Sequence, residues 1–103
     1  MNDVFLSCRI YVVENAPNSQ RALQNLTTFC RTYLPDKHKI EIVDVFAHPE
    51  RALAERVLLT PTLVIDLPLP ARRIVGDLSD GKLLRQALNI DTRGPDARAS
   101  TDA

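Results

Sequence analysis

The lengths of the connections between apolar segments constrain this fold most. Residues 4–13 and 40–46 are apolar stretches rich in Val, Ile and Phe, and the segment between them has its apolar residues at helical spacing. Such a strand–helix–strand unit crosses over in a right-handed sense and leaves its two strands parallel. Residues 61–66 and 72–75 are further strand candidates joined only by LPLPA, so they are expected to form an antiparallel hairpin. The sequence therefore predicts a mixed four-stranded sheet.

Three helices are expected around these strands, which makes the chain an α/β protein with the element order β-α-β-α-β-β-α. The first helix begins near Pro17, a residue suited to a first helical turn, with Asn15 or Asn18 as its cap. The second helix is expected over 48–59, and the third begins after Ser79, which is expected to cap it. All three are expected to pack on the sheet.

Length and charge limit the domain count and the classes of partner. A chain of 103 residues forms one domain, expected over 1–90, because the polar residues 91–103 have little to bury and are expected to be a disordered tail. The 13 basic and 13 acidic residues cancel, which argues against nucleic acid or an anionic membrane as partner and removes charge repulsion as an obstacle to self-association. The chain has no apolar run long enough to cross a membrane and no secretion signal, so a cytoplasmic protein is expected.

A proline stands at the start of the third expected strand. Proline is normally kept out of central strands because it cannot donate a ladder hydrogen bond. In thioredoxin-like domains, which the expected element order resembles, a residue–proline pair at this place is usually cis, and an X–Pro bond adopts cis at a cost of about 0.5–1 kcal/mol. We therefore expect a cis bond between Thr60 and Pro61. An ordinary trans proline that ends the second helix is the alternative.

The thiol chemistry of such domains has no counterpart in this sequence. A redox enzyme of this fold needs a nucleophilic cysteine at the first strand–helix junction, where the helix N-terminus stabilises the thiolate. Here the junction reads ENAPNS, while Cys8 lies within the first strand and Cys30 on the apolar face of the first helix. Both are expected to be buried structural thiols. We expect no enzyme activity; a thioredoxin-like thiol or glutathione-dependent oxidoreductase is the alternative, supported by the proline alone.

Other cofactor and metal chemistry also lacks a motif. Neither His38 nor His48 has a Cys, Asp or Glu at a metal-ligand spacing, and the three glycines are dispersed and form no phosphate-binding loop. Asp77 and Asp80 precede the third helix, where aspartate is common as a cap. No cofactor and no metal ion are expected.

Five segments of the chain resemble the circadian clock protein family KaiB. Over residues 4–90 the resemblance is continuous, and it implies a non-catalytic protein that binds the N-terminal ATPase ring of the KaiC hexamer and modulates its phosphorylation cycle. It also implies KaiA or a SasA-like kinase as further partners and a homo-oligomer, dimer or tetramer, at rest. A detached sensor domain of a SasA-related kinase is another interpretation. The matching segments are IYV (10–12), NAPNSQRAL (15–23), IVDV (42–45), HPERALAERV (48–57) and LLTPTLVIDLPLPARRIVGDLSD (58–80).

The resemblance also implies where partners bind. The second helix and its approach would face KaiC as an apolar stripe with flanking charges, a common recognition mode. Alternatively, Val57 is a core residue, and the arginines are solvated side chains without a partner protein. The residues implied to contact KaiC are Glu50, Ala54, Arg56 and Val57, and those implied to contact a further partner are Arg21 and Arg73.

Members of this family change fold in their C-terminal half, and the prolines of this chain fit that behaviour. Thr60-Pro61, Pro68 and Pro70 interrupt regular pairing, so the stretch commits weakly to one structure and two packings within a few kcal/mol become feasible. Better-known members carry Gly at the position of Ala87. Because Ala favours a helix over Gly by about 0.8–1 kcal/mol, we expect this chain to favour the thioredoxin-like form.

Overall fold

The computed structural model describes residues 4–90. The expected order of elements is confirmed, and the expected tail at 91–103 lies outside the described residues. The elements are β1 (Leu6–Val12), α1 (Pro17–Tyr33), β2 (His38–Asp44), α2 (Pro49–Ala54), β3 (Thr62–Leu67), β4 (Arg72–Val75) and α3 (Gly81–Ala87). No helix in this part of the chain is long and apolar enough to span a membrane.

The four strands form one mixed sheet in the spatial order β2-β1-β3-β4. β1 pairs in parallel with β2 and antiparallel with β3, and β3 pairs antiparallel with β4. The predicted parallel unit and the predicted hairpin are therefore both confirmed. β1 and β3 are the central strands, and β2 and β4 are the two edges.

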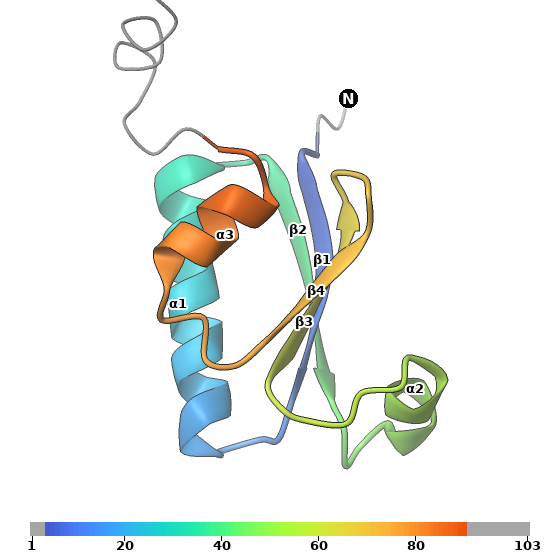
Figure 1. Cartoon of the computed structure of the whole chain (residues 1–103). Helices are drawn as coiled ribbons and strands as arrows, with labels where there is room; N and C mark the ends of the chain where they lie inside the picture. Colours follow the sequence, from blue (N-terminus) through green and yellow to red (C-terminus); the bar gives the residue numbers. More distant parts are fainter. Residues whose placement is uncertain (1–3, 91–103) are drawn as a thin grey trace, which may run out of the picture.

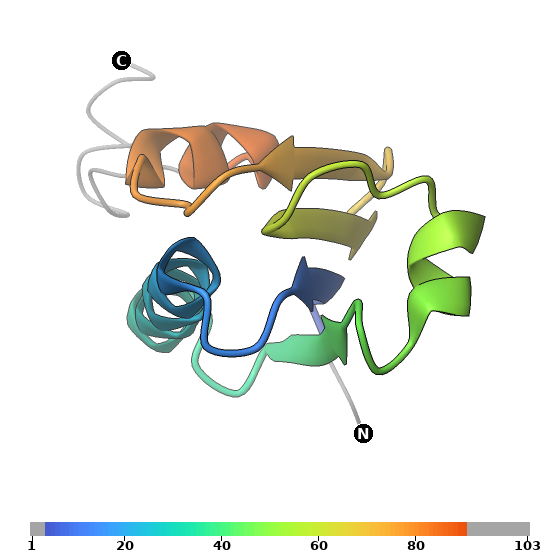
Figure 2. The same ribbon diagram turned by 90° about the horizontal axis from the view of Figure 1, so that it is seen from below.

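The main core lies between the sheet and the layer formed by α1 and α3, which cover the same face (Figures 1 and 2). Alternate residues of β1 point into it, as a pleated strand requires. α1 presents its buried side chains at intervals of three and four residues, the spacing of one helical face. The buried members from these two elements are Leu6, Cys8, Ile10, Val12, Ala22, Leu26, Phe29 and Cys30.

A second and much smaller core lies on the other face of the sheet. Tyr11, Val43 and Val64 are its buried residues, and the half-buried side chains of Val45, Ala52 and Val57 pack against them. α2 lies on this side of the sheet, opposite α1 and α3 (Figure 2). Much of the apolar surface that the chain buries is thus on the α1 and α3 side, and α2 is held by few apolar contacts.

The second helix is much shorter than predicted. The sequence predicts a helix over 48–59, whereas α2 ends at Ala54 and contains six residues. Arg56 has a positive φ of 56°, a left-handed conformation that typically ends a helix. The residues that follow therefore form a connection to β3.

Two predicted helix caps are wrong. α1 has Ala16 at its N-cap and no side-chain cap, so neither Asn15 nor Asn18 serves, although Pro17 does start the helix. α3 is capped by Asp80, whose carboxylate accepts a 3.0 Å hydrogen bond from the Lys82 amide. Ser79 instead donates its own amide to the Asp77 carboxylate, at 3.0 Å, in the preceding turn.

The peptide bond between Thr60 and Pro61 is cis, as predicted. The bonds that precede Pro68 and Pro70 are also cis. Pro61 is buried, and its carbonyl oxygen accepts a 2.9 Å hydrogen bond from the Gly76 amide at the end of β4. The proline therefore lies at the end of the sheet from which the connection leads back to α2.

Candidate functional site

The place where a thiol-exchange site would lie contains no sulfur. Cys8 pairs with Ile65 across the sheet, which puts it about 13 Å along the strand direction from Pro61. Cys30 lies near the end of α1, about 20 Å along the helix from Pro17. These are the only two cysteines of the chain.

Both cysteines are buried in the main core, as predicted, with exposed fractions of 2% for Cys8 and 0% for Cys30. Burial, with a smaller contribution from the neighbouring Cys30 thiol, raises the pKa of Cys8 to about 12. Burial likewise raises the pKa of Cys30 to about 11. Because only a thiolate is an effective nucleophile, both side chains are unreactive at neutral pH.

No cluster of three His, Cys, Asp or Glu side chains that could hold a metal ion occurs within residues 4–90. The Leu34 carbonyl oxygen accepts a 2.7 Å hydrogen bond from His38 Nδ1. His48 precedes α2 and lies 3.7 Å from the Glu50 carboxylate. Both histidines therefore have local partners in the fold.

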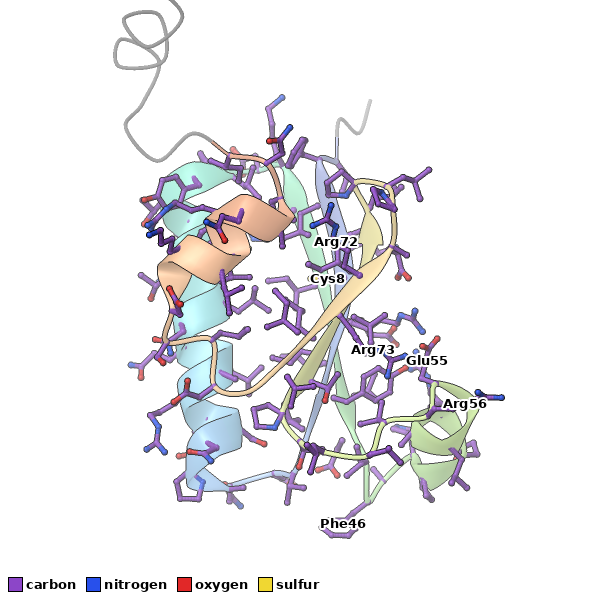
Figure 3. All side chains as sticks on the ribbon, in the orientation of Figure 1. Cys8, Phe46, Glu55, Arg56, Arg72 and Arg73 are labelled. Carbon is purple, nitrogen blue, oxygen red and sulfur yellow. The ribbon has the colours of Figure 1, made fainter. Side chains whose placement is uncertain are left out.

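Four large apolar side chains are exposed on and around α2, and we call them the α2 patch. Phe46 comes from the β2–α2 connection, Leu53 from α2, and Leu58 and Leu59 from the connection to β3. Their exposed fractions are 78%, 78%, 91% and 64%. Phe46 points away from the body of the molecule (Figure 3). Large apolar side chains exposed around one short element make this region a candidate protein-binding surface.

The residues that sequence analysis placed on the KaiC-facing surface lie in the same region. Glu50, Ala54 and Arg56 are exposed, and Val57 is half-buried against the second core cluster. The alternative expectation for Val57, a contact with the core, is therefore confirmed. The sequence does not predict the α2 patch, because the expected helix over 48–59 places these leucines within a helix that packs on the sheet. The signal that could have found it is the pair Leu58-Leu59 immediately before Thr60-Pro61.

The structure does not bring Arg21 and Arg73 together. Arg21 extends from α1, and its Nε lies 3.5 Å from the Asp77 carboxylate in the connection to α3. That interaction adds to the hydrogen bonds from Ser79, which are the main reason that the pKa of Asp77 lies below its usual value. Arg73 lies on the edge strand β4 and contacts Glu55 on the α2 side of the sheet (Figure 3). Both arginines therefore have partners within the chain.

Comparison with known proteins identifies the family. The family model described as the KaiB domain matches residues 9–90. The chain belongs to the KaiB family. It is 37% identical over 102 residues to the circadian clock protein KaiB3 of Synechocystis sp., covering 99% of this chain and 98% of the relative. It is 43% identical over 82 residues to the circadian clock oscillator protein KaiB of Synechococcus elongatus, covering 80% of each chain. Membership of this clock protein family supports a regulatory role.

Solved structures confirm the thioredoxin-like fold. The N-terminal domain of Synechococcus elongatus SasA superimposes with a TM-score of 0.66 at 20% identity, covering 82% of this KaiB-family chain and 80% of that one. Mitochondrial thioredoxin 3 of Saccharomyces cerevisiae gives 0.66 at 18% identity, covering 86% and 79%. At such identities the likeness concerns the fold alone.

Proposed function

We propose that this KaiB-family chain is a non-catalytic clock regulator that binds the N-terminal ATPase ring of the KaiC hexamer and modulates its phosphorylation cycle. The observation that carries the proposal is the α2 patch, an exposed apolar surface on a member of a clock protein family. The absence of a thiol near Pro61 supports a binding role over thiol exchange.

The region around α2 has the composition of a docking surface. Apolar side chains of the α2 patch supply area to bury, and the exposed Glu50 and Arg56 flank it with one charge of each sign. A buried apolar centre with a polar rim is the usual anatomy of a protein interface. Glu50, Ala54, Arg56 and Val57 are the residues proposed to contact KaiC.

Co-elution with purified KaiC hexamer, with and without ATP, tests the proposal. We expect the unmodified chain to bind and Leu58→Asp to lose at least about tenfold in affinity, because a charge would be placed in the centre of an apolar interface. Leu58 is nearly fully exposed, so the variant is expected to fold normally. The matched control is Leu69→Asp, an exposed leucine in the β3–β4 connection at the other end of β3.

Two results would contradict the proposal. If the unmodified chain did not co-elute with KaiC, or if Leu58→Asp and Leu69→Asp bound equally well, the α2 patch would not be the docking surface. Turnover in an insulin-reduction or glutathione-transfer assay, abolished by removing a cysteine, would favour the oxidoreductase alternative instead.

Further clock partners form a second part of the proposal. Because the SasA N-terminal domain shares the fold, a SasA-like kinase is proposed to compete with this chain for KaiC, and KaiA is proposed as a partner that would use Arg21 or Arg73. The proposed competition is tested by adding a SasA-type domain to the complex of this chain with KaiC and measuring whether the chain is displaced. Simultaneous binding of both proteins would count against a shared site.

We also infer that the chain has the fold-switching and self-associating behaviour implied by its family. The residues proposed to govern the change are Thr60, Pro61, Pro68, Pro70 and Ala87. NMR spectra of the free chain would show a second set of signals for the C-terminal half, and light scattering would show a dimer or tetramer. A single set of signals from a monomer under all conditions would contradict both.

A further inference from the structure

α2 is too short and too poorly buried to hold its own position. It contains six residues, and none of them is fully buried. Isolated helices of fewer than about 12 residues are marginal in water. Only Ala52 within the helix and Val57 after it pack against the second core cluster. Other contacts must therefore fix the helix that carries part of the α2 patch.

Within the helix, Arg51 pairs with Glu41 on β2, and the remaining contacts converge on Glu55, the residue directly after α2. Its carboxylate accepts from Arg9 on β1, with Nη1 3.1 Å from Oε2, and from Arg73 on β4, with Nη2 3.3 Å from Oε1. Figure 3 shows Arg73 and Glu55 facing each other between β4 and α2. We call Arg9, Glu55, Asp66 and Arg73 the Glu55 clasp. One carboxylate thus links the end of α2 to two strands of the sheet.

Arg73 also satisfies the end of the helix. The last carbonyl groups of a helix have no partner within it, and a cation near them is favourable. Arg73 Nη2 donates to the Glu55 carbonyl oxygen at 2.8 Å, and Nη1 donates to that of Arg56 at 3.4 Å. A planar guanidinium can reach both carbonyls at once, whereas an ammonium group is a single point charge.

Arg9 is held in place before it meets Glu55. Its Nε and Nη2 donate to the two carboxylate oxygens of Asp66 at 3.2 and 2.8 Å, and Nη1 lies 3.3 Å from the Tyr11 hydroxyl. This bidentate pair orients the guanidinium, and the hydrogen bonds to Asp66 are the main cause that raises the pKa of Arg9. Little further side-chain entropy is lost when it binds Glu55.

We propose that Arg9 and Arg73, acting through Glu55, are positioning residues that orient α2 and so present the α2 patch. Neither arginine belongs to the patch. The part of this inference that concerns docking rests on the proposed function, whereas the part that concerns α2 can be measured in the free chain.

Amide hydrogen exchange in the free chain is the first measurement. The Val57 amide, which donates to the Ala52 carbonyl oxygen at 2.9 Å, and the Glu55 amide, which donates to that of Arg51 at 3.1 Å, report on α2. Arg73→Met is expected to speed their exchange about five- to tenfold, because two carbonyl contacts and an ion pair are lost. Arg9→Met is expected to speed it about two- to fivefold, since one partly exposed ion pair is lost.

Three comparisons separate positioning from a general loss of stability. Arg73→Lys should recover only part of the protection, because it keeps the charge and loses the fork. When Glu55→Gln is combined with Arg9→Met, their effects on amide exchange should be less than additive, since both remove the same contact. In about 1 M salt, where charges are strongly screened, the effect of Arg9→Met should shrink. Main-core amides in β1 and β3 should exchange at unchanged rates throughout.

Arg72→Met is the matched control. Arg72 is the adjacent exposed arginine on β4 and points to the other face of the strand. Exchange at Glu55 and Val57 that is no faster in Arg73→Met than in Arg72→Met would overturn the proposal. So would full recovery by Arg73→Lys, because any positive charge would then suffice.

Affinity for the KaiC hexamer is the second measurement. We expect the variants to weaken binding in the same rank order as they speed exchange, with Arg73→Met about three- to tenfold weaker than the unmodified chain and Arg72→Met unchanged. Faster exchange with unchanged affinity would overturn the role in presenting the patch. If the unmodified chain did not bind KaiC, the proposed function would fail, and the exchange data would still decide whether the Glu55 clasp orients α2.

Discussion

On the face of the sheet covered by α1 and α3, a large cluster of buried apolar side chains joins helices to strands, whereas on the α2 face the three buried residues all come from strands. The large exposed apolar residues around α2 contrast with this small core. Charged groups supply much of the remaining contact there, through Glu55 and through the Arg51–Glu41 pair at 2.6 Å.

The two faces of this small sheet meet different requirements, stability on one and the exposure of apolar side chains on the other. Apolar burial provides most folding free energy, so the α1 and α3 face is expected to carry the stability of the chain. Ion pairs at partly exposed positions contribute little to stability, but they orient the element that they contact, here α2. The α2 face can therefore keep apolar side chains in water, where a partner can bury them.

The largest expected effect tests where stability resides. Leu26→Ala removes a fully buried side chain of α1 and should lower the free energy of unfolding by about 2–5 kcal/mol, because it leaves a cavity. Leu53→Ala, which truncates an exposed leucine of α2, should change it by less than about 0.5 kcal/mol. Urea denaturation measures both. Equal losses would show that the two faces contribute alike.

Alkaline pH should weaken the α1 and α3 face selectively, since both thiols lie in its core. Their pKa values of about 12 and 11 exceed the ordinary 9.0, so above pH 9 the unfolded chain releases protons that the folded chain retains. Stability is then fully present below pH 9 and is lost as pH rises toward the folded values, on the order of 2 kcal/mol by pH 10. Urea denaturation between pH 7.5 and 10 measures it.

The double variant Cys8→Ala, Cys30→Ala is the control for the alkaline effect. It starts from a lower stability because it leaves small cavities, so the comparison concerns the slope of stability against pH. We expect a flatter slope above pH 9 than in the unmodified chain. Equal slopes would mean that the thiols do not cause the loss.

The two short helices offer a matched pair of glycine substitutions. Ala87→Gly in α3, whose side chain packs against the main core, should lower the free energy of unfolding by about 0.5–1 kcal/mol and raise any second set of NMR signals. Ala52→Gly in α2 should instead speed the exchange of α2 amides with little change in global stability. The reverse result would contradict the assignment of stability to the α1 and α3 face.

The smallest effects concern two carboxylates near the surface, one for each face. Arg51 holds the pKa of Glu41 below its ordinary value, and hydrogen bonds from Ser79 do so for Asp77. Stability from a depressed pKa is present above the ordinary value and lost as pH falls through the folded one. Glu41→Gln and Asp77→Asn should therefore lower Tm slightly at pH 7 and not at pH 2. Hydrogen exchange should change near α2 for the first and near the β4–α3 connection for the second.

The architecture of this chain can be predicted from its sequence, whereas the shape of the α2 region cannot. The order of elements, the parallel and antiparallel pairings, the burial of Cys8 and Cys30 and the cis bond at Thr60-Pro61 are all confirmed. The predicted second helix extends beyond Ala54, because apolar residues continue at helical spacing after that position. Propensity could not show that Arg56 turns into the left-handed region and ends the helix.

The partners of the charged residues were also beyond sequence reasoning. Arg9 lies 46 residues from Glu55 and 57 from Asp66 in the chain, and no local pattern connects them. Arg73 was interpreted as a contact for a further partner, whereas its guanidinium faces the end of α2. The contacts that KaiC or another partner makes with these residues stay a prediction.

The sequence by itself determined which segments become strands and helices and how neighbouring strands run, because periodicity and the length of a connection are local properties of the chain. The tertiary structure alone decided that Leu53, Leu58 and Leu59 lie in water and that Arg9 and Arg73 share one carboxylate. Exposure and ion pairing depend on which distant segments occupy the neighbouring space, and that is settled only when the layers have packed.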